Sequence, residues 1–380
     1  MTTATLEIDD RELTLAFAQR QLLNLRPRLG ISSAVERLVA IQAQNHASVA
    51  QALAARLDIG RLPGVDADLN RFGGLRKGTL MRGTLHVVTE RDHRQFAGAL
   101  RPSGLSHWRR KHGAAGADEE AIVAALRAAL RRPCTVDEVR AVVAKASCGT
   151  IPERHLMHTA KALIPLVHHV EPGVAVVQGR PLLVQADDVA TDVPAATAHL
   201  VARYLAGFGP ASRRDIATFT SLGLRTIDAA LTRINAEVRF RDSRGRTLVD
   251  LLNMDRVAQQ GTLPTRFLPK WDSALLGHDQ RDRILPNAYR EKVIIRANGD
   301  VKAVYLVDGL VAGTWEADFS GRTATLTLHP LGPADGAPDL EAEADRWIRL
   351  LHPRAERFEL RTTPSTAPPR ESDVVKDHSR

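Results

Sequence analysis

Helical periodicity alternates with short strand patterns along the first 268 residues, and the alternation repeats. Residues 118–132 carry apolar side chains at helical spacing, with an acidic first turn and arginines at the end, as the helix dipole favours. Thr135 and Glu138 then form a capping box, which predicts that a second helix begins there. A third helical segment over 151–167 leads into 167–185, whose pattern predicts two strands joined by a turn. Three helices followed by a β-ribbon predict a winged helix, a variant of the helix-turn-helix.

A second copy of this pattern spans residues 195–252. Its first helix is predicted to stop at a Gly-Pro pair, and Ser212 with Asp215 in the capping-box position begins the next one. The helix that follows, 224–234, occupies the position of a recognition helix, and a hairpin is predicted to turn near Gly245. This segment therefore predicts another winged-helix unit.

The first 112 residues carry a looser version of the same pattern. It predicts a strand at 80–89 and helices at 14–23, 33–44, 48–57, 68–78 and 90–100.

From residue 269 the sequence pattern changes to short segments with strand character, separated by Asn-Gly, Asp-Gly and Ser-Gly, which are strong hairpin signals. We expect a small antiparallel barrel, followed by a helix over 339–351. Proline and polar residues dominate 364–380, which predicts a disordered tail.

These patterns predict an α+β fold of three tandem winged-helix units followed by a C-terminal antiparallel β-barrel. The expected domain boundaries give three units, a barrel domain with its terminal helix, and a tail, at 1–112, 113–192, 193–268, 269–363 and 364–380.

The charge balance is basic. Lys and Arg number 52 against 44 Asp and Glu, a formal net charge of +8, and all but eight of the cations are arginine. An arginine surplus suits a polyanionic partner, but the codon bias of a GC-rich genome would produce the same composition. Composition alone favours neither explanation.

The sequence contains no apolar stretch long enough for a membrane span and no secretory signal pattern, so we expect a cytoplasmic, nucleoid-associated protein. Two cysteines, Cys134 and Cys148, could form at most one disulfide, which fits a reducing compartment.

His155 and His158 could share a helix face, but no third metal ligand follows at a recognisable spacing. Together with the lack of a Gly-rich phosphate loop, this predicts neither a metal nor a cofactor.

Gln42 is the most unusual polar residue of the first unit. A helix starting at Ser33 would place it on the same buried stripe as Val35, where an amide must find partners or face a cavity. Gln44 would lie about 200° further round an ideal helix, so the two amides flank one space only if the helix ends between them. The alternative is an interior amide that is hydrogen-bonded to a neighbouring helix.

Four stretches resemble the AlkZ/YcaQ family of bacterial DNA glycosylases: LVAIQAQ, LMRGTLHVV, YLAGFGPASRRDIATF, and FLPKWDSALLGH with its sequel VDGLVAGTW. The resemblance implies three winged-helix units and a β-barrel around a concave DNA channel, and removal of alkylated purines by N-glycosidic hydrolysis. The family's catalytic motif is Gln-x-Gln or Gln-x-Asp. Gln42-Ala43-Gln44 places this chain with the Gln-x-Gln branch, which includes self-resistance enzymes of antibiotic producers. The family's His-x-Asp-Arg is replaced here by His278-Asp279-Gln280-Arg281, which displaces the acid.

The chemistry of the expected substrate makes two catalytic glutamines intelligible. A purine alkylated at N7 or N3 is already cationic and leaves as a neutral base. Glutamine cannot take a proton at neutral pH, but its carbonyl oxygen can orient a water and face a cationic sugar. We therefore expect a monofunctional DNA glycosylase for alkylpurines, without the lysine-dependent strand cleavage of a lyase. Bulky adducts or crosslinks are further possible substrates.

The expected partner is double-stranded DNA carrying alkylated purines, bound by a monomer. The basic residues expected to contact DNA are Lys77, Arg82, Arg154, Lys161, Arg213, Arg214, Arg225 and Arg233. Each has the alternative of being a solvated surface charge. A non-catalytic winged-helix transcriptional regulator is the rival function, and a sugar- or nucleotide-binding protein is a third.

Overall fold

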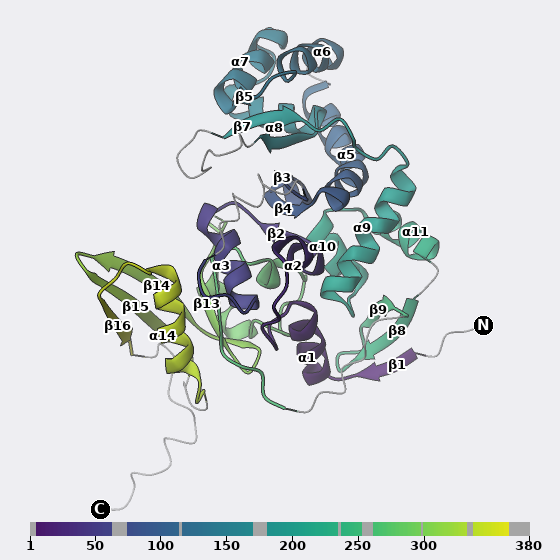
Figure 1. The fold of residues 1–380 in the computed structure, drawn as a ribbon. Helices are drawn as coiled ribbons and strands as arrows, with labels where there is room; N and C mark the ends of the chain where they lie inside the picture. Colours follow the sequence, from purple (N-terminus) through teal and green to yellow (C-terminus); the bar gives the residue numbers. More distant parts are fainter. Residues whose placement is uncertain are drawn as a thin grey trace, which may run out of the picture.

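The computed structural model describes residues 5–62, 74–113, 116–169, 181–234, 237–252, 261–297, 299–332 and 337–364. Helices and strands mix along the whole chain (Figure 1). The first part contains β1 (Thr5–Ile8), α1 (Asp10–Arg20), α2 (Ile31–Arg37), β2 (Ile41–Gln42), α3 (His46–Arg56), β3 (Leu75–Thr79), the 3₁₀ turn η1 (Met81–Gly83), β4 (Leu85–Thr89) and α5 (Glu90–His112).

The helix predicted over 33–44 is wrong in its second half. α2 starts after Gly30 and ends at Arg37, so Gln42 lies on the strand β2 and not on a helix. The next helix, α3, is capped by Asn45, whose side chain accepts a hydrogen bond from the Ala47 N–H at 2.9 Å.

Packing against α9 (Val193–Phe208) accounts for the early end of α2. Val39 has a φ of 70°, a conformation that a β-branched residue adopts only where the surrounding structure imposes it. A Cβ at Gly207 would lie 2.4 Å from Val39 Cγ2, so the lack of a side chain lets the two segments meet. The sequence of the helix alone carries no sign of this contact.

The region after α3 also differs from the prediction. Of the helix predicted over 68–78, residues 68–73 lie outside the described residues, and Leu75–Thr79 forms the strand β3. The strand predicted over 80–89 starts only at Leu85, because η1 turns the chain first. The prediction of a helix at 90–100 is confirmed by α5, which continues to His112.

The second segment contains α6 (Glu119–Ala129), β5 (Cys134–Thr135), α7 (Val136–Ala146), the 3₁₀ turn η3 (Glu153–His155), α8 (Leu156–Leu163), β6 (Leu166–His169) and β7 (Leu182–Gln185). The capping box of Thr135 and Glu138 is confirmed, and β6 pairs antiparallel with β7 as predicted. The turn between these two strands lies outside the described residues.

One six-stranded sheet joins the first two segments, in the order β2-β4-β3-β6-β7-β5. The junction is the antiparallel pair β3–β6, where Gly78 is opposite Val167. Strands from both sides of the predicted boundary at 112–113 therefore share a sheet, and the predicted domain boundaries remain predictions.

The third segment follows the sequence pattern closely. It contains α9, α10 (Arg213–Thr220), α11 (Leu224–Ile234), β8 (Glu237–Asp242) and β9 (Thr247–Leu251). The capping box of Ser212 and Asp215 and the β8–β9 hairpin, whose Gly245 has a φ of 73°, are confirmed. The N-terminal strand β1 pairs parallel with β8, a contact that the sequence did not reveal. The winged-helix interpretation of these units stays a prediction.

The C-terminal β-barrel prediction is wrong. The elements there are β10 (Arg266–Leu268), α12 (Ser273–Leu276), the 3₁₀ turn η4 (Asn287–Tyr289), α13 (Arg290–Val293), β11 (Ile294–Ile295), β12 (Asp300–Val301), β13 (Val304–Val307), β14 (Leu310–Ser320), β15 (Thr323–Pro330), α14 (Leu340–Leu351) and β16 (Arg357–Thr362). Five strands form an open sheet in the order β10-β13-β14-β15-β16, and β16, which was not predicted, pairs parallel with β15.

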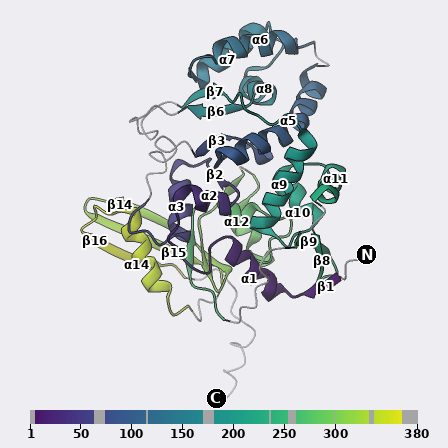
Figure 2. The same ribbon diagram turned by 45° about the vertical axis from the view of Figure 1, so that its right-hand side comes forward.

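The helix α14 explains why this sheet need not close on itself. Its buried Trp347 and Ile348 belong to the same hydrophobic cluster as Leu326 and Leu328 of β15, so the helix buries apolar side chains of the sheet. Figures 1 and 2 both show α14 against the β14–β16 sheet. The predicted disordered tail lies almost entirely outside the described residues.

The largest hydrophobic cluster combines distant parts of the chain. It contains Phe17 of α1, Tyr204 of α9, Phe219 of α10, Phe267 of β10 and Trp347 of α14. The N-terminal, central and C-terminal segments therefore share one core.

In the part of the chain that the structure describes, no helix combines the length and apolar character needed to cross a membrane. Within the same residues, no group of three or more His, Cys, Asp or Glu side chains is arranged to hold a metal ion. Cys134 is buried and Cys148 is exposed, and both are free thiols.

Candidate catalytic site

Gln42 lies at the edge of the six-stranded sheet, where β2 pairs antiparallel with β4 and Gln42 is opposite His86. Only 5% of Gln42 is exposed. Its backbone N–H donates to Ser273 Oγ at 3.2 Å, and its side-chain oxygen Oε1 accepts from Arg82 Nη2 at 2.9 Å. The buried side-chain amide expected from the sequence is thus bound by Arg82, and the backbone of the same residue is bound by Ser273, so the two contacts come from two other segments of the chain.

Arg82 is the centre of this site. Its Nη1 donates to the Phe219 carbonyl oxygen at 3.0 Å, and its guanidinium lies 5.3 Å from the centroid of the Phe219 ring. Burial, with a smaller contribution from the nearby charge of Arg281, lowers the pKa of Arg82 to about 10. Arg82 remains a cation at neutral pH and fixes the orientation of the Gln42 amide.

His86 completes the group on β4. It is fully buried, its Nδ1 lies 3.0 Å from the Thr84 carbonyl oxygen, and its Nε2 lies 3.4 Å from Arg82 Nη2. These contacts require a neutral ring that donates from Nδ1 to Thr84 and accepts at Nε2. Burial, with a smaller contribution from Arg82, lowers the pKa of His86 to about 3. His86 is therefore a very weak base at neutral pH.

Gln44 lies two residues beyond Gln42 and is exposed. The Leu85 N–H contacts its side-chain oxygen at a long 3.4 Å, and the Leu85 carbonyl accepts from the Ala43 N–H at 2.8 Å. The Ala43 contact extends the β2–β4 pairing by one residue, and Gln44 lies in the bend between β2 and α3. Both glutamines therefore lie beside β4, Gln42 buried in the strand pairing and Gln44 exposed in the bend.

A buried ion pair anchors the C-terminal segment beneath Gln42. Arg56 of α3 donates to both carboxylate oxygens of Asp272, at 2.8 and 2.7 Å, and the two side chains are only 2% and 1% exposed. Asp272 also caps α12, which begins at Ser273, the residue that accepts from the Gln42 N–H. The WDSALL stretch thus positions the backbone of β2.

A pocket of about 590 Å³ lies beside Arg82, between η1, α5, α8 and the end of α10. Arg82 and the predicted DNA contact Lys161 both line it. Gln42 is not among its lining residues, so Arg82 is the connection between the pocket and the glutamine motif.

The other predicted DNA-contacting residues are dispersed. Arg213 and Arg214 begin α10 and line a separate groove of about 730 Å³, in which Arg213 is paired with Asp228 at 2.7 Å. Lys77 of β3 lines a third, smaller recess with His168 and His169. Exposed side chains elsewhere are those of Arg154 on η3 and of Arg225 and Arg233 on α11.

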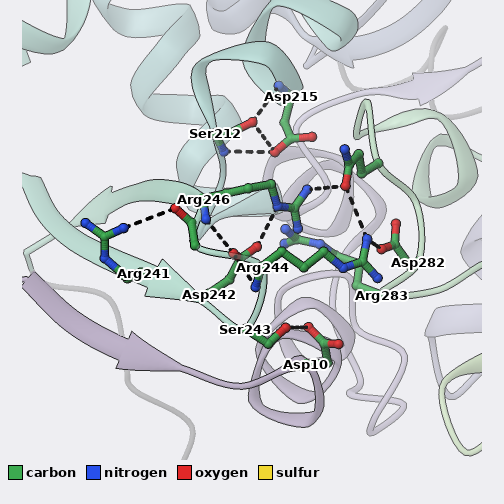
Figure 3. Close-up of polar contacts among 12 residues, drawn as sticks. Asp10, Ser212, Asp215, Arg241, Asp242, Ser243, Arg244, Arg246, Asp282 and Arg283 are labelled. Carbon is green, nitrogen blue, oxygen red and sulfur yellow. Dashed lines mark hydrogen bonds and ion pairs between the residues drawn. The ribbon is translucent and has the colours of Figure 1, made fainter.

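The loop at residues 278–281, where the acid of the expected His-x-Asp-Arg motif is displaced, contacts other parts of the structure. The Asp279 N–H donates to Asp215 Oδ1 at 2.9 Å, and Gln280 Oε1 accepts from Arg244 at 3.2 Å and from Arg246 at 2.9 Å. Figure 3 shows Arg244 and Arg246 of the β8–β9 hairpin beside this loop, with Arg244 paired to Asp282. The loop therefore connects α10, the hairpin and the C-terminal segment.

The sequence analysis did not identify His86 and Ser273 as residues of the site. Ser273 could have been placed at the start of a helix, because an aspartate directly before Ser-Ala-Leu-Leu is a helix N-cap signal. His86 could not have been found, because its role depends on the β2–β4 register and the sequence pattern predicted a helix at Gln42.

Comparisons with known proteins place the chain in a family. Residues 35–350 match a family model described as DNA glycosylase AlkZ-like, a range that includes both glutamines, Arg82 and Asp272. Among solved structures, the chain is similar to Streptomyces sahachiroi DNA glycosylase AlkZ, with a TM-score of 0.76 and 20% sequence identity, covering 94% of this chain and 100% of that one. No curated protein matches significantly. Since the family model spans most of the chain, this protein belongs to the AlkZ-like DNA glycosylase family.

Proposed function

We propose that this chain is a monofunctional DNA glycosylase that hydrolyses the N-glycosidic bond of purines alkylated at N7 or N3. The placement of Gln42 on β2 and of Gln44 in the bend that follows, both against β4 and within the region matched by the family, carries the proposal. Gln42 is fixed from two sides by Arg82 and Ser273, whereas Gln44 is exposed. A site that presents one rigid and one accessible amide is suited to holding a water molecule.

The two amides have complementary roles in this proposal. Arg82 occupies one lone pair of Gln42 Oε1, which leaves the second lone pair and the amide N–H groups of Gln42 for the reacting groups. Gln44 Oε1 has only the long contact to Leu85 and can accept a hydrogen bond from the water. The water oxygen bonds to C1′ of the sugar while the C1′–N bond breaks. The purine leaves with the bonding electron pair as a neutral base, and the water's proton passes to solvent.

The chemistry of the site favours leaving groups that are already activated. His86, with a pKa of about 3, removes protons poorly at neutral pH. A neutral glutamine cannot act as a general base either. A cationic alkylpurine needs no such help, because its departure discharges the positive charge. Bulky natural-product adducts and crosslinks are the finer substrate classes within this proposal, including a role in antibiotic self-resistance.

Replacement of the glutamines tests the mechanism. We expect Gln44→Ala to slow single-turnover release of N7-methylguanine from an oligonucleotide by about a hundredfold, or on the order of 3 kcal/mol in the barrier. Its melting temperature should stay unchanged, because Gln44 is exposed. Gln44→Asp restores the carboxylate of the sister branch and should retain or raise activity.

Gln42→Ala separates catalysis from a purely structural role. The proposal predicts slower release by the folded protein as well as a lower melting temperature, since the amide is buried. The amide control is Gln185→Ala on β7, which should release base at the wild-type rate. Full-rate release by the Gln42→Ala, Gln44→Ala double variant would refute the catalytic proposal, and so would a Gln42→Ala protein that melts earlier but reacts normally.

We propose duplex DNA as the partner of a monomer, with the helix–helix–ribbon units acting as winged helices along a basic channel. Arg225 on α11 is exposed and supports backbone contact rather than a structural role. Charge reversal at Arg225 should weaken binding to all DNA sequences about equally, because phosphate contacts carry no sequence information. A strongly sequence-dependent loss would instead indicate a transcriptional regulator.

A further inference from the structure

The pocket beside Arg82 concentrates positive charge without compensation. Four permanent or near-permanent cations line it: Arg82, Arg101 and Arg110 with Lys161. No aspartate or glutamate is among its lining residues in the described chain. A recess with walls of one sign of charge raises the local concentration of ligands of the opposite sign.

The same pocket contains an unsatisfied buried group. His93 lines it, is 1% exposed, and its Nδ1 has no hydrogen-bond partner among the described residues. Burial lowers the pKa of His93 to about 4, so the ring is neutral at neutral pH. A buried polar atom without a partner costs free energy, so His93 Nδ1 is a hydrogen-bonding group that a small adjustment of the pocket wall could offer to a ligand.

The positive charges that line the pocket distinguish between two kinds of ligand, a purine base and a nucleic-acid backbone, that would both fit by size. A pocket of about 590 Å³ accommodates a flipped purine or a stretch of nucleic-acid backbone. An N7-alkylated purine is cationic, and four cations would repel it. A phosphodiester carries one negative charge per nucleotide and matches the lining.

We propose that this pocket binds the phosphodiester backbone of the DNA strand beside the excision site, with Arg101, Arg110 and Lys161 as its phosphate ligands. The inference rests on the proposed function, since it takes DNA as the partner. It adds two residues of α5, Arg101 and Arg110, which sequence reasoning did not single out.

Arg82 gives the pocket a consequence for the catalytic site. Its guanidinium lines the pocket and also donates to Gln42 Oε1 at 2.9 Å. An unneutralised guanidinium at this distance from Gln42 opposes the build-up of positive charge on the sugar. Phosphates bound in the pocket offset that charge and hold the strand beside Arg82.

The salt dependence of DNA binding tests the proposal. The dissociation constant for an undamaged duplex is measured between about 50 and 200 mM salt, for the wild type and for the Arg101→Ala, Arg110→Ala double variant. Both side chains are exposed, so the fold should be unaffected. Since each neutralised phosphate contributes about 0.9 to the slope of log affinity against log salt, we expect the slope to become shallower by about 1 to 2.

A matched pair controls for net charge. Arg127 in the last turn of α6 and Arg131 just beyond this helix are exposed and do not line the pocket. The Arg127→Ala, Arg131→Ala variant also removes two positive charges. This variant should keep a slope close to that of the wild type. Equal flattening by both double variants would mean that only net charge counts, and would overturn the proposal.

The outcomes for the pocket and for the proposed function are distinguishable. If the wild type releases alkylated bases but the two double variants bind alike, only the pocket proposal fails. If the wild type releases no base while the slopes differ, only the glycosylase proposal fails. In single-turnover assays the pocket variant should need more enzyme for half-saturation, with little change in the saturated rate.

Discussion

The buried ion pair between Arg56 and Asp272 should decide whether the C-terminal segment supports the glutamine site. The two side chains are 2% and 1% exposed and share two hydrogen bonds of 2.8 and 2.7 Å. Asp272→Asn keeps an oxygen that can still accept from the Ala274 N–H at the start of α12, so this substitution removes the charge and keeps the cap. The retained oxygen can still accept from Arg56 Nη2, but the second oxygen, which accepts from Arg56 Nη1, is replaced by an NH2 group, and the buried guanidinium loses its countercharge.

The expected cost follows from that uncompensated charge. Removing one partner of a buried pair typically destabilises a protein by about 3–5 kcal/mol, whereas replacing both partners with neutral groups is often close to neutral. Asp272→Asn and Arg56→Met should each lower the free energy of unfolding by about that amount. The Arg56→Met, Asp272→Asn double variant should be more stable than either single variant.

Equilibrium urea unfolding, followed by tryptophan fluorescence and circular dichroism, measures these differences. Asp58→Asn is the control, because its partner Arg28 is 86% exposed, and it should leave the unfolding midpoint nearly unchanged. The reasoning is refuted if Asp272→Asn costs as little as the control, or if the double variant costs the sum of the single variants. Because Ser273 accepts from the Gln42 N–H, the single variants should also release alkylated bases more slowly.

Two further predictions concern stability. The pKa values of the buried His86 and His93 are lowered to about 3 and about 4, so below the unfolded value of about 6.5 the unfolded chain binds protons that the folded chain does not. The stability that comes from keeping these rings neutral is therefore fully present above about pH 6.5 and is lost as the pH falls. Between about pH 7 and about pH 5.5, each histidine should lower the free energy of unfolding by about 1.2 kcal/mol, measured by urea unfolding at both pH values. Replacing either histidine with Gln should make the free energy of unfolding depend less on pH. Gly207→Ala would place a Cβ 2.4 Å from Val39 Cγ2 and should destabilise the protein by about 1–3 kcal/mol in thermal melts; an unchanged melting temperature would show that the α9 contact does not impose the bend at Val39.

The sequence alone was sufficient to predict the local interactions. The capping boxes of Thr135 with Glu138 and of Ser212 with Asp215, and the hairpin turn at Gly245, involve groups only a few residues apart. Their hydrogen bonds form between neighbours whatever the rest of the chain does. The resemblance to a glycosylase family was also carried by sequence alone, because it depends on short motifs in a fixed order.

Tertiary contacts decided the geometry of the site. The end of α2 depends on the contact of Val39 with Gly207, and that bend moved Gln42 from a helix to a strand. The partners of Gln42 come from Arg82 and Ser273, which lie 40 and 231 positions away in the chain. The open C-terminal sheet likewise depends on the long-range pairing of strands and on cover from α14. No local pattern specifies such pairings, because their free energy comes from burying surfaces that meet only in the folded chain.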